Sequence, residues 1–549
     1  MQQKLWTKHY PTGVPLEIEF ESYKSIIDLF EESTDRFAHN VAFKCMGATL
    51  TYQELEEHSR DFAAFLQNRG LEKGDRIAIQ MPNCLQYPIV LFGALRAGLI
   101  VVNTNPLYTA REMKHQFHDS GVKAIVILSN FAHVLQEVLP ETDIELVVTT
   151  GLGDLLGFPK SFIVNTVVKY VKKMVPAYDI VDEVNFYQAL DEGSLHDFVT
   201  PSFDSGDIAF LQYTGGTTGV SKGAMLTHRN IIANMLQIAE WMKPRLGEGE
   251  VIVTALPLYH IFSLTVNCLA FMYRGSTNLL VTNPKDIPAF IKLLDKEHYT
   301  VMSGVNTLFN ALMNHPDFTS IDFSKLKISV AGGMALQNAV AERWKKMTGT
   351  PVIEGYGLTE ASPVVACNPV DGTDRTGTIG LPLSATDVKL VNDDGIIVKD
   401  GEAGELCLKG PQVMKGYWNK PDETDKMMLA DGWLRTGDMA VMDKDGFFKI
   451  VDRKKDMILV SGFNVYPNEV EDVVASQGQV AEVAAVGVPD EHSGEVVKIF
   501  VVKKGTVTEK DIIDYCKKNL VGYKVPKFVE FRTELPKTNV GKILRRALR

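Results

Sequence analysis

The sequence predicts an α/β protein: a large N-terminal domain of two doubly wound α/β subdomains plus a small β-barrel, followed by a small α+β C-terminal domain. Three observations support this fold class. Short runs rich in β-branched residues alternate with helical lengths over much of the chain, closely spaced strands with glycine turns begin at about residue 376, and a compact mixed module follows residue 452. A chain of 549 residues is also too long for one hydrophobic core.

The alternation begins with a predicted helix over 51–70, where apolar residues recur at helical spacing, and a strand over 76–81 follows. The same rhythm recurs in extended runs at 123–128, 146–150, 251–256 and 328–333. This pattern is typical of parallel sheets with helices on both faces. The apolar run 88–102 is too short for a transmembrane helix and carries Arg96, so we expect a buried helix and strand there.

The β-rich stretch covers about 376–451, and two Asp-Gly turn signals separate its alternating segments. Farther on, Thr508 with Asp511 three residues later predicts a capped helix over 509–520. We therefore expect a large domain over 1–451, a boundary at 452–453 and a C-terminal domain over 454–549.

Composition excludes several classes of function. The formal net charge of −11 argues against a nucleic-acid-binding protein, which needs a basic surface. The six cysteines lie far apart without a CxxC pair, so we expect reduced structural thiols of a cytoplasmic protein. Residues 1–15 contain no apolar run of the kind that marks a secretory signal.

The stretch YTGGTTGVSKGAM at 213–225 follows the apolar run 208–212 and predicts a phosphate-binding loop. Glycines let backbone N–H groups approach phosphate oxygens, and Lys222 supplies a positive charge. The loop of kinases and ATPases needs Gly-Lys-Ser/Thr, whereas Lys222 follows Ser221 and precedes Gly223, so the spacing excludes that class. The structural alternative is a surface turn rich in glycine and threonine.

Three further polar motifs lie downstream of this loop. The run 351–362 bears Tyr356 and Glu360, an aromatic ring that can stack on a base and a carboxylate that can help to hold Mg²⁺. Asp438, within 432–440, could accept hydrogen bonds from ribose hydroxyls. Lys542 occupies a glycine-marked turn in the basic run 536–549, for which a solvated tail is the alternative.

Together with ALPLYHIF, EGYGLTE, GWLRTGD and PKTNVGKILRR, which stand in order along the chain, these motifs resemble the adenylate-forming (acyl-activating, AMP-binding) superfamily. Within it, the sequence is most similar to bacterial long-chain fatty-acyl-CoA synthetases. The resemblance implies that ATP and a carboxylic acid give an acyl-adenylate and pyrophosphate, after which coenzyme A takes the acyl group and AMP leaves. It also implies a C-terminal domain that is mobile about a hinge at Asp452.

The resemblance assigns roles to individual residues. Lys542, Glu360 and Thr214 would be catalytic, with Thr214 and Glu360 holding Mg²⁺ and Lys542 entering the site during adenylation only. The ATP phosphates would bind along the loop, at Tyr213, Thr214, Gly215, Gly216, Thr217, Thr218, Gly219, Val220, Ser221, Lys222, Gly223 and Ala224. The rest of ATP would contact Gly333, Tyr356, Gly357, Thr359, Asp438, Arg453 and Lys455, and the acyl group and CoA would contact His260, Ser461 and Gly462.

The expected partners are a fatty acid, ATP and CoA. Val305, Leu308 and Phe309 are apolar candidates for the acyl pocket, and Leu459 stands where some relatives carry a nucleotide-binding lysine. Two other functions stay open at this stage: an adenylating ligase that uses another acid or a carrier-protein acceptor, and a nucleotide-binding regulatory or lipid-carrier protein without catalysis. A homodimer is also open.

The segment 160–178 has an apolar stripe that includes Ile163, Val164 and Val171, with Asn165 and three lysines on the other side and no acidic residue. Such a helix could lie on the cytoplasmic face of the inner membrane, where fatty acids partition. The alternative is a helix packed on its own domain with a solvated lysine face.

Overall fold

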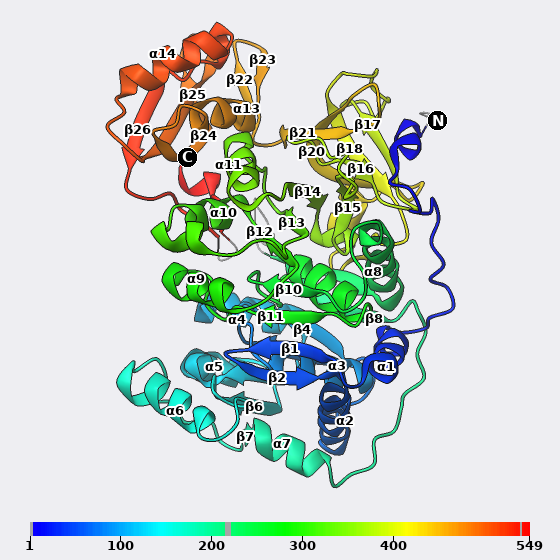
Figure 1. Cartoon of the computed structure of the whole chain (residues 1–549). Helices are drawn as coiled ribbons and strands as arrows, with labels where there is room; N and C mark the ends of the chain where they lie inside the picture. Colours follow the sequence, from blue (N-terminus) through cyan, green and yellow to red (C-terminus); the bar gives the residue numbers. More distant parts are fainter. Residues whose placement is uncertain (1–3, 215–220, 539–540) are drawn as a thin grey trace.

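The computed structural model describes residues 4–214, 221–538 and 541–549 (Figure 1). Within these ranges the strands form two large sheets, a small antiparallel sheet and a separate sheet in the C-terminal region. This arrangement confirms the predicted α/β class.

The first large sheet has the strand order β19-β9-β8-β4-β3-β5-β6-β7. Its parallel strands are β3 (Arg76–Gln80), β4 (Ile100–Asn103), β5 (Ala124–Leu128), β6 (Leu146–Thr150), β7 (Val184–Asn185) and β8 (Ile208–Thr214). At one edge, β9 (Lys222–Thr227) pairs antiparallel with β8 and with β19 (Gly416–Tyr417). The accompanying helices are α2 (Tyr52–Asn68), α3 (Gln86–Arg96), α4 (Ala110–Ser120), α5 (Ala132–Val138) and α7 (Phe186–Gly193).

The predicted buried helix and strand over 88–102 are α3 and β4, and every residue of both is buried. Arg96 is only 1% exposed, and its guanidinium lies 3.0 Å from a carboxylate oxygen of Glu31 and 3.1 Å from one of Glu56. These ion pairs compensate the buried charge, which would otherwise be costly.

The second large sheet has the order β16-β15-β14-β13-β12-β10-β11-β1-β2. Its strands are β1 (Val41–Cys45), β2 (Ala48–Thr51), β10 (Val251–Thr254), β11 (Thr277–Leu280), β12 (Val301–Gly304), β13 (Ile328–Ala331), β14 (Val352–Gly357), β15 (Val364–Cys367) and β16 (Leu381–Pro382). The helices that precede or alternate with the strands β10 to β14 are α8 (His228–Met242), η5 (Ser263–Ala270), α9 (Ile287–Lys296), α10 (Asn306–Met313) and α11 (Asn338–Thr348).

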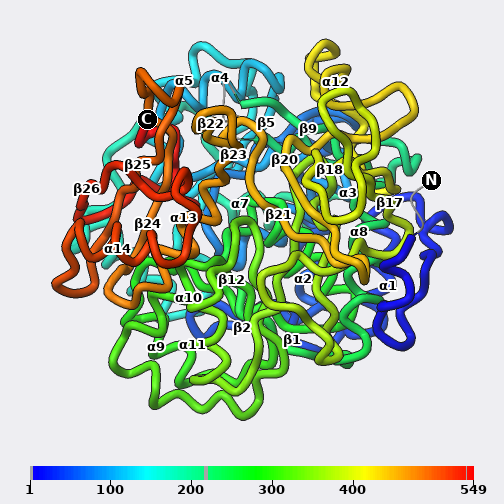
Figure 2. Tube along the Cα trace, turned by 90° about the horizontal axis from the view of Figure 1, so that it is seen from above, coloured from blue at the N-terminus to red at the C-terminus, as the bar shows by residue number. Residues whose placement is uncertain are grey.

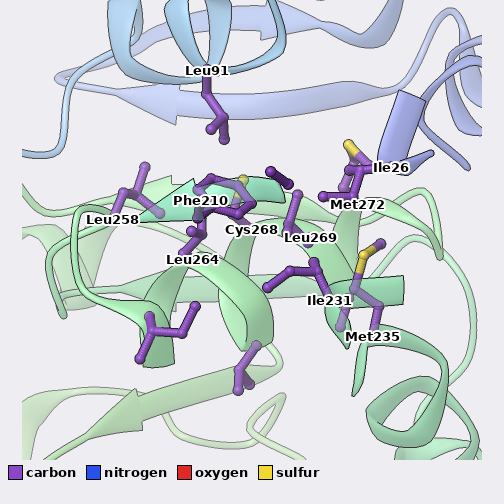
Figure 3. Packing of buried hydrophobic residues seen from close by; sticks show 14 of the residues in the cluster. Ile26, Leu91, Phe210, Ile231, Met235, Leu258, Leu264, Cys268, Leu269 and Met272 are labelled. Atoms are coloured by element: carbon purple, nitrogen blue, oxygen red, sulfur yellow. The ribbon is translucent and has the colours of Figure 1, made fainter. Parts of the chain in front are cut away.

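The two large sheets share one hydrophobic core (Figure 3). In this core Leu91 of α3 and Phe210 of β8 meet Ile231 of α8 and Leu264 of η5. The helices α8 and η5 therefore lie between the sheets, and their positions depend on packing from both sides.

The β-rich region forms an antiparallel sheet of β17 (Asp387–Val391), β18 (Gly404–Lys409), β20 (Leu434–Met442) and β21 (Phe448–Arg453). The expected boundary at 452–453 therefore lies at the end of β21 rather than in a loop. Asp452 is buried and ion-paired with Arg545, whose guanidinium lies 3.0 Å away.

The C-terminal region combines α13 (Pro467–Ala475) and α14 (Glu509–Asn519) with the strands β22 (Ile458–Val460), β23 (Phe463–Val465), β24 (Val480–Asp490), β25 (Gly494–Lys503) and β26 (Phe528–Arg532). The predicted cap of α14 is confirmed, since Thr508 and Asp511 form a capping box. This region has its own core and lies over α10 and α11 (Figures 1 and 2). Asn310 of α10 donates to the carbonyl of Ala481 at 3.3 Å.

Candidate active site

A cavity opens at the carboxyl ends of the parallel strands β13 and β14, the edge where ligands bind in open α/β sheets. Its lining comes from α8 and η5, from these two strands and the loops after them, and from the C-terminal region. The lining residues are Ile238, Trp241, Met242, His260, Ile261, Phe262, Val266, Val330, Ala331, Gly332, Gly333, Gly355, Tyr356, Gly357, Leu358, Thr359, Pro363, Val364, Cys367, Leu383 and Lys542.

Three predicted nucleotide contacts meet beside the cavity. The Tyr356 hydroxyl donates to Oδ2 of Asp438 at 2.6 Å, and Nε of Arg453 lies 3.4 Å from Oδ1 of the same carboxylate. Asp438 and Arg453 are opposite each other in the ladder of β20 and β21. Burial raises the pKa of the Asp438 carboxyl, while the Arg453 charge acts in the other direction. An acceptor with an adjacent cation can therefore face a hydroxyl-bearing ligand here.

Lys542 enters the cavity from the C-terminal end of the chain. A Cβ atom at Gly333 would lie 3.1 Å from Cε of Lys542, and Gly333 has φ +79°, so both the approach and the backbone favour glycine. Burial lowers the pKa of Lys542 to about 8; the Arg453 charge adds to this, and Asp438 and Glu360 oppose it. The solvated-tail interpretation is therefore wrong for this lysine.

Glu360 and Lys222 are linked through Tyr417. The Tyr417 hydroxyl donates to Oε1 of Glu360 at 2.6 Å, and Nζ of Lys222 lies 4.5 Å from the centre of the Tyr417 ring. Lys222 also forms an ion pair with Glu423 of α12 (Pro421–Met427), at 2.8 Å. The Lys222 ammonium lowers the pKa of the Glu423 carboxyl to about 2, and Lys426 contributes to the same shift.

Sequence reasoning missed Tyr417 and Glu423. They lie in GYWNKPDET at 416–424, about 200 positions after Lys222, and that stretch carries no glycine-rich or periodic signal. Only the pairing of β19 with β9 brings them to the loop.

The predicted phosphate loop is described only at its two ends. Thr214 and Lys222 face each other as the last pair of the β8–β9 hairpin, while Gly215, Gly216, Thr217, Thr218, Gly219 and Val220 lie outside the described residues. Tyr213 turns away from the cavity, since its hydroxyl donates to Asp119 at 2.7 Å, and Ala224 is buried. A Cβ at Gly223 would come within 3.1 Å of the Tyr213 ring. The Ser221 carbonyl lies 3.0 Å from Nε2 of His115.

His260 lines the cavity as a neutral imidazole. Burial lowers its pKa to about 3, with the Lys542 charge as a second cause, and its Nδ1 accepts from the Phe262 N–H at 3.3 Å. Gly357 has a packing role, because a Cβ there would lie 2.2 Å from the Pro363 carbonyl oxygen. Thr359 begins the short turn η7 (Thr359–Ala361), next to Glu360.

Several predicted residues do not line the cavity. One of these residues is Lys455. Burial lowers its pKa, and the charge of nearby Arg453 lowers it further. Ser461 and Gly462 form the exposed turn between β22 and β23, where the Ser461 N–H donates to the Ser493 carbonyl at 2.7 Å. Leu459 of β22 is 48% exposed.

The apolar candidates for the acyl pocket lie outside this cavity. Val305, Leu308 and Phe309 are not among the residues that line the cavity. Phe309 packs against Trp344 of α11, with ring centres 4.7 Å apart, so α10 turns its apolar face to α11. The apolar lining comes instead from Ile238, Trp241 and Met242 of α8 and from Val266 of η5.

The donor set fits Mg²⁺ bound together with a phosphate ligand. Among the described residues no group of three or more His, Cys, Asp or Glu side chains could hold a metal ion alone. Glu360 offers one carboxylate, and Thr214 offers a hydroxyl at the end of β8. Mg²⁺ is usually held by one or two carboxylates plus substrate phosphates, so these two donors suffice.

Comparison with known proteins agrees with this geometry. Residues 30–418 match the family model "AMP-binding enzyme", and residues 469–542 match "AMP-binding enzyme C-terminal domain". The long-chain-fatty-acid–CoA ligase of Salmonella typhimurium is 58% identical, covering all of this chain and 98% of the relative, and that of Bacillus subtilis is 40% identical with the same coverage.

Among solved structures, ATP-bound MatB from Rhodopseudomonas palustris has a TM-score of 0.82 and 27% identity, over 96% of this chain and 98% of that one. This similarity in fold extends over the two sheets and the C-terminal region described above. The chain belongs to the AMP-binding enzyme family.

Proposed function

We infer that the chain is a long-chain fatty acid–CoA ligase. It uses ATP to activate the acid as an acyl-adenylate, releases pyrophosphate, and then transfers the acyl group to CoA with release of AMP. The observation that carries this function is the cavity itself, which has an apolar lining from α8 and η5 and receives Lys542 from the C-terminal region. Identity of 58% over the full length of a curated relative supports the substrate class.

The first step needs no Ser-His or Cys-His machinery, because a fatty acid carboxylate is already ionised at pH 7. The difficulty is to bring this anion against the α-phosphate of ATP. The Lys542 ammonium, in the cavity, stabilises negative charge that develops there. When bound, Mg²⁺ would neutralise charge on the ATP phosphates, and Glu360 and Thr214 would hold it.

The rest of ATP is proposed to bind along the polar side of the cavity. The adenine would lie between Gly333 and Tyr356, and the Asp438 carboxylate would accept from the ribose hydroxyls. Arg453 and Lys455 would lie near the ribose and phosphates. For Arg453 this position is supported by its distance of 3.4 Å from Asp438.

At the phosphate end, Thr359 would meet the α-phosphate, and Lys222 with the loop 213–224 would bind the β- and γ-phosphates. This placement requires that Lys222 exchange its ion pair with Glu423 for the pyrophosphate group of ATP.

The acyl chain is proposed to extend from His260 toward Trp241, Met242 and Val266, all of which line the cavity. A neutral imidazole suits this position, because a charged one would face an apolar chain. Each buried methylene contributes about 0.8 kcal/mol, so such a pocket discriminates chain length in small steps.

The second step needs a different face of the C-terminal domain. We propose that the domain over 454–549 rotates about 452–453, withdraws Lys542 and brings Ser461 and Gly462 to the pantetheine arm of CoA. The exposed turn that carries Ser461 and Gly462 supports this, since neither residue lines the cavity in the present arrangement. All six cysteines are free and buried, which suits a reducing cytoplasm.

A chain-length series tests this function. The full chain is incubated with ATP, Mg²⁺, CoA and fatty acids from short to long, and acyl-CoA and AMP are measured. We expect equal amounts of both products, with the highest kcat/KM for long chains. Preference for an aromatic or short acid would assign another substrate, and AMP formation without acyl-CoA would indicate another acceptor, such as a carrier protein.

A further inference from the structure

The segment 158–174 exposes an unusual number of large apolar side chains. It comprises α6 (Lys160–Thr166) and the π-helical turn η4 (Val167–Val171), which lie at the edge of the molecule beside β6 and β7, and neither contains a buried residue (Figure 1). The most exposed apolar side chains are Phe158 (90%), Val171 (71%), Phe162 (67%), Tyr170 (67%), Met174 (54%) and Ile163 (53%). Contiguous exposed apolar surface of this kind usually marks an interaction site.

The inner face of this helix is held by polar contacts. The Gly153 N–H donates to Oδ1 of Asn165 at 2.7 Å, and Nδ2 of Asn165 donates to Asp154 at 2.9 Å. Val164 packs against the core beside them. The sequence pattern grouped Asn165 with the lysines and Ile163 with Val164 in one apolar stripe, whereas in the structure Asn165 faces inward and Ile163 is exposed.

The outer face is defined by exposure. Phe162 and Ile163 lie on α6, Lys169 and Tyr170 on η4, and Lys173 follows the C-cap Lys172. All five are exposed, and Nζ of Lys169 lies 5.7 Å from the Tyr170 ring centre. Aromatic, aliphatic and basic side chains therefore alternate on one surface, which we call the outer face.

The charge of this segment differs from that of the whole chain. Residues 158–174 contain four lysines and no acidic residue, in a protein of formal net charge −11. Of these lysines, Lys160 is occupied, since its ammonium donates to the Met46 carbonyl. Lys169, Lys172 and Lys173 are exposed and form no salt bridge within the described residues.

We propose that the outer face binds the surface of an anionic lipid bilayer, with its aromatic and aliphatic side chains among the headgroups and its lysines against lipid phosphates. Amphipathic helices with lysine beside Phe and Tyr bind membranes in this way. A second copy of the chain fits this surface poorly, because a two-fold contact would place two sets of lysines against each other. No described helix is long and apolar enough to cross a membrane, so the contact is with the surface.

Vesicle flotation of the full chain tests this proposal, without ATP, CoA or fatty acid, so that its outcome is independent of the proposed ligase activity. The vesicles contain phosphatidylcholine alone or with added phosphatidylglycerol. We expect binding only when phosphatidylglycerol is present, weakened by salt. The triple variant Lys169→Gln, Lys172→Gln, Lys173→Gln should bind about 100-fold more weakly, since each lysine near an anionic surface contributes about fivefold.

Two further variants complete the design. Phe162→Ser with Ile163→Ser should also lose binding, whereas a matched triple Lys→Gln variant at the exposed Lys510, Lys517 and Lys518 of α14 should bind like the wild type. Unchanged thermal denaturation confirms that each variant is folded. Wild-type protein that does not float, or variants that float equally, would overturn the proposal. So would an outer-face variant that changes only the oligomeric state in sedimentation velocity.

Discussion

Replacing Lys542 by alanine separates the two half-reactions of the proposed mechanism. The ammonium of Lys542 lies within the cavity near Gly333, while the turn 461–462 that would serve the second step lies outside it. Lys542→Ala should therefore reduce formation of the acyl-adenylate, yet leave conversion of preformed acyl-adenylate and CoA to acyl-CoA close to that of the wild type.

The structure also sets the size and the pH dependence of this loss. Loss of one charged donor at a reacting centre typically costs roughly 10²- to 10³-fold in rate, or about 2.7–4 kcal/mol. With a pKa of about 8, roughly ten of eleven molecules carry the charge at pH 7. Because only protonated Lys542 stabilises the anionic centre, kcat/KM for ATP in adenylation should fall as pH rises through about 8. The Lys542→Ala variant should not show this decrease.

Two assays measure the outcome. Pyrophosphate release reports adenylation, and acyl-CoA formation from synthetic acyl-adenylate reports the second step. Lys537→Ala is a matched control, because Lys537 pairs with Glu482 and does not line the cavity. If Lys542→Ala slows both half-reactions equally, the proposed alternation of the C-terminal domain is refuted.

Three more predictions follow from contacts around the cavity. Tyr356→Phe removes the 2.6 Å hydrogen bond to Asp438 and should raise KM for ATP about tenfold or more, because a hydrogen bond to a charged group contributes about 1.5 kcal/mol or more; an unchanged KM would contradict the ribose role of Asp438. Glu423→Gln should lower KM for ATP a few-fold, since Lys222 no longer has to leave its ion pair; a higher KM would show that Glu423 positions Lys222 for ATP. Val266→Phe should shift the preferred acid to shorter chains, by up to about fourfold in relative kcat/KM per methylene; an unchanged profile, with a normal melting temperature, would place the acyl chain elsewhere.

Local sequence patterns predicted the layered fold well. The runs at 123–128, 146–150 and 328–333 contain β5, β6 and β13, because short β-branched runs between helices have few other stable arrangements. The strand order was not predictable in the same way. β1 pairs with β11, more than 230 positions later, and no local pattern encodes such a contact.

The candidate site likewise has one part that the sequence predicted and another that depends on long-range strand pairing. Tyr356, Asp438 and Lys542 carry motifs that the sequence reveals, and the structure brings them to one cavity or its edge. Tyr417 and Glu423 reach Lys222 only through the β19–β9 pairing, so the ion pair and the hydrogen bond they make could not be predicted.

The apolar lining of the cavity could not be predicted from the sequence, for a related reason. Apolar residues of α10 and of α8 look alike in sequence, and only tertiary packing decides that Phe309 contacts Trp344 whereas Trp241 faces the cavity. Orientation of a helix within a core depends on its neighbours rather than on its own composition.

Transfer of an oxygen label tests the central claim most directly. A long-chain fatty acid with ¹⁸O in its carboxylate is incubated with the protein, ATP, Mg²⁺ and CoA, and the products are analysed by mass spectrometry. If the carboxylate attacks the α-phosphate and the CoA thiol then displaces AMP from the acyl carbon, one ¹⁸O atom should appear in AMP for each acyl-CoA formed, and none in pyrophosphate. Label in pyrophosphate or phosphate, or unlabelled AMP alongside acyl-CoA, would contradict an acyl-adenylate intermediate.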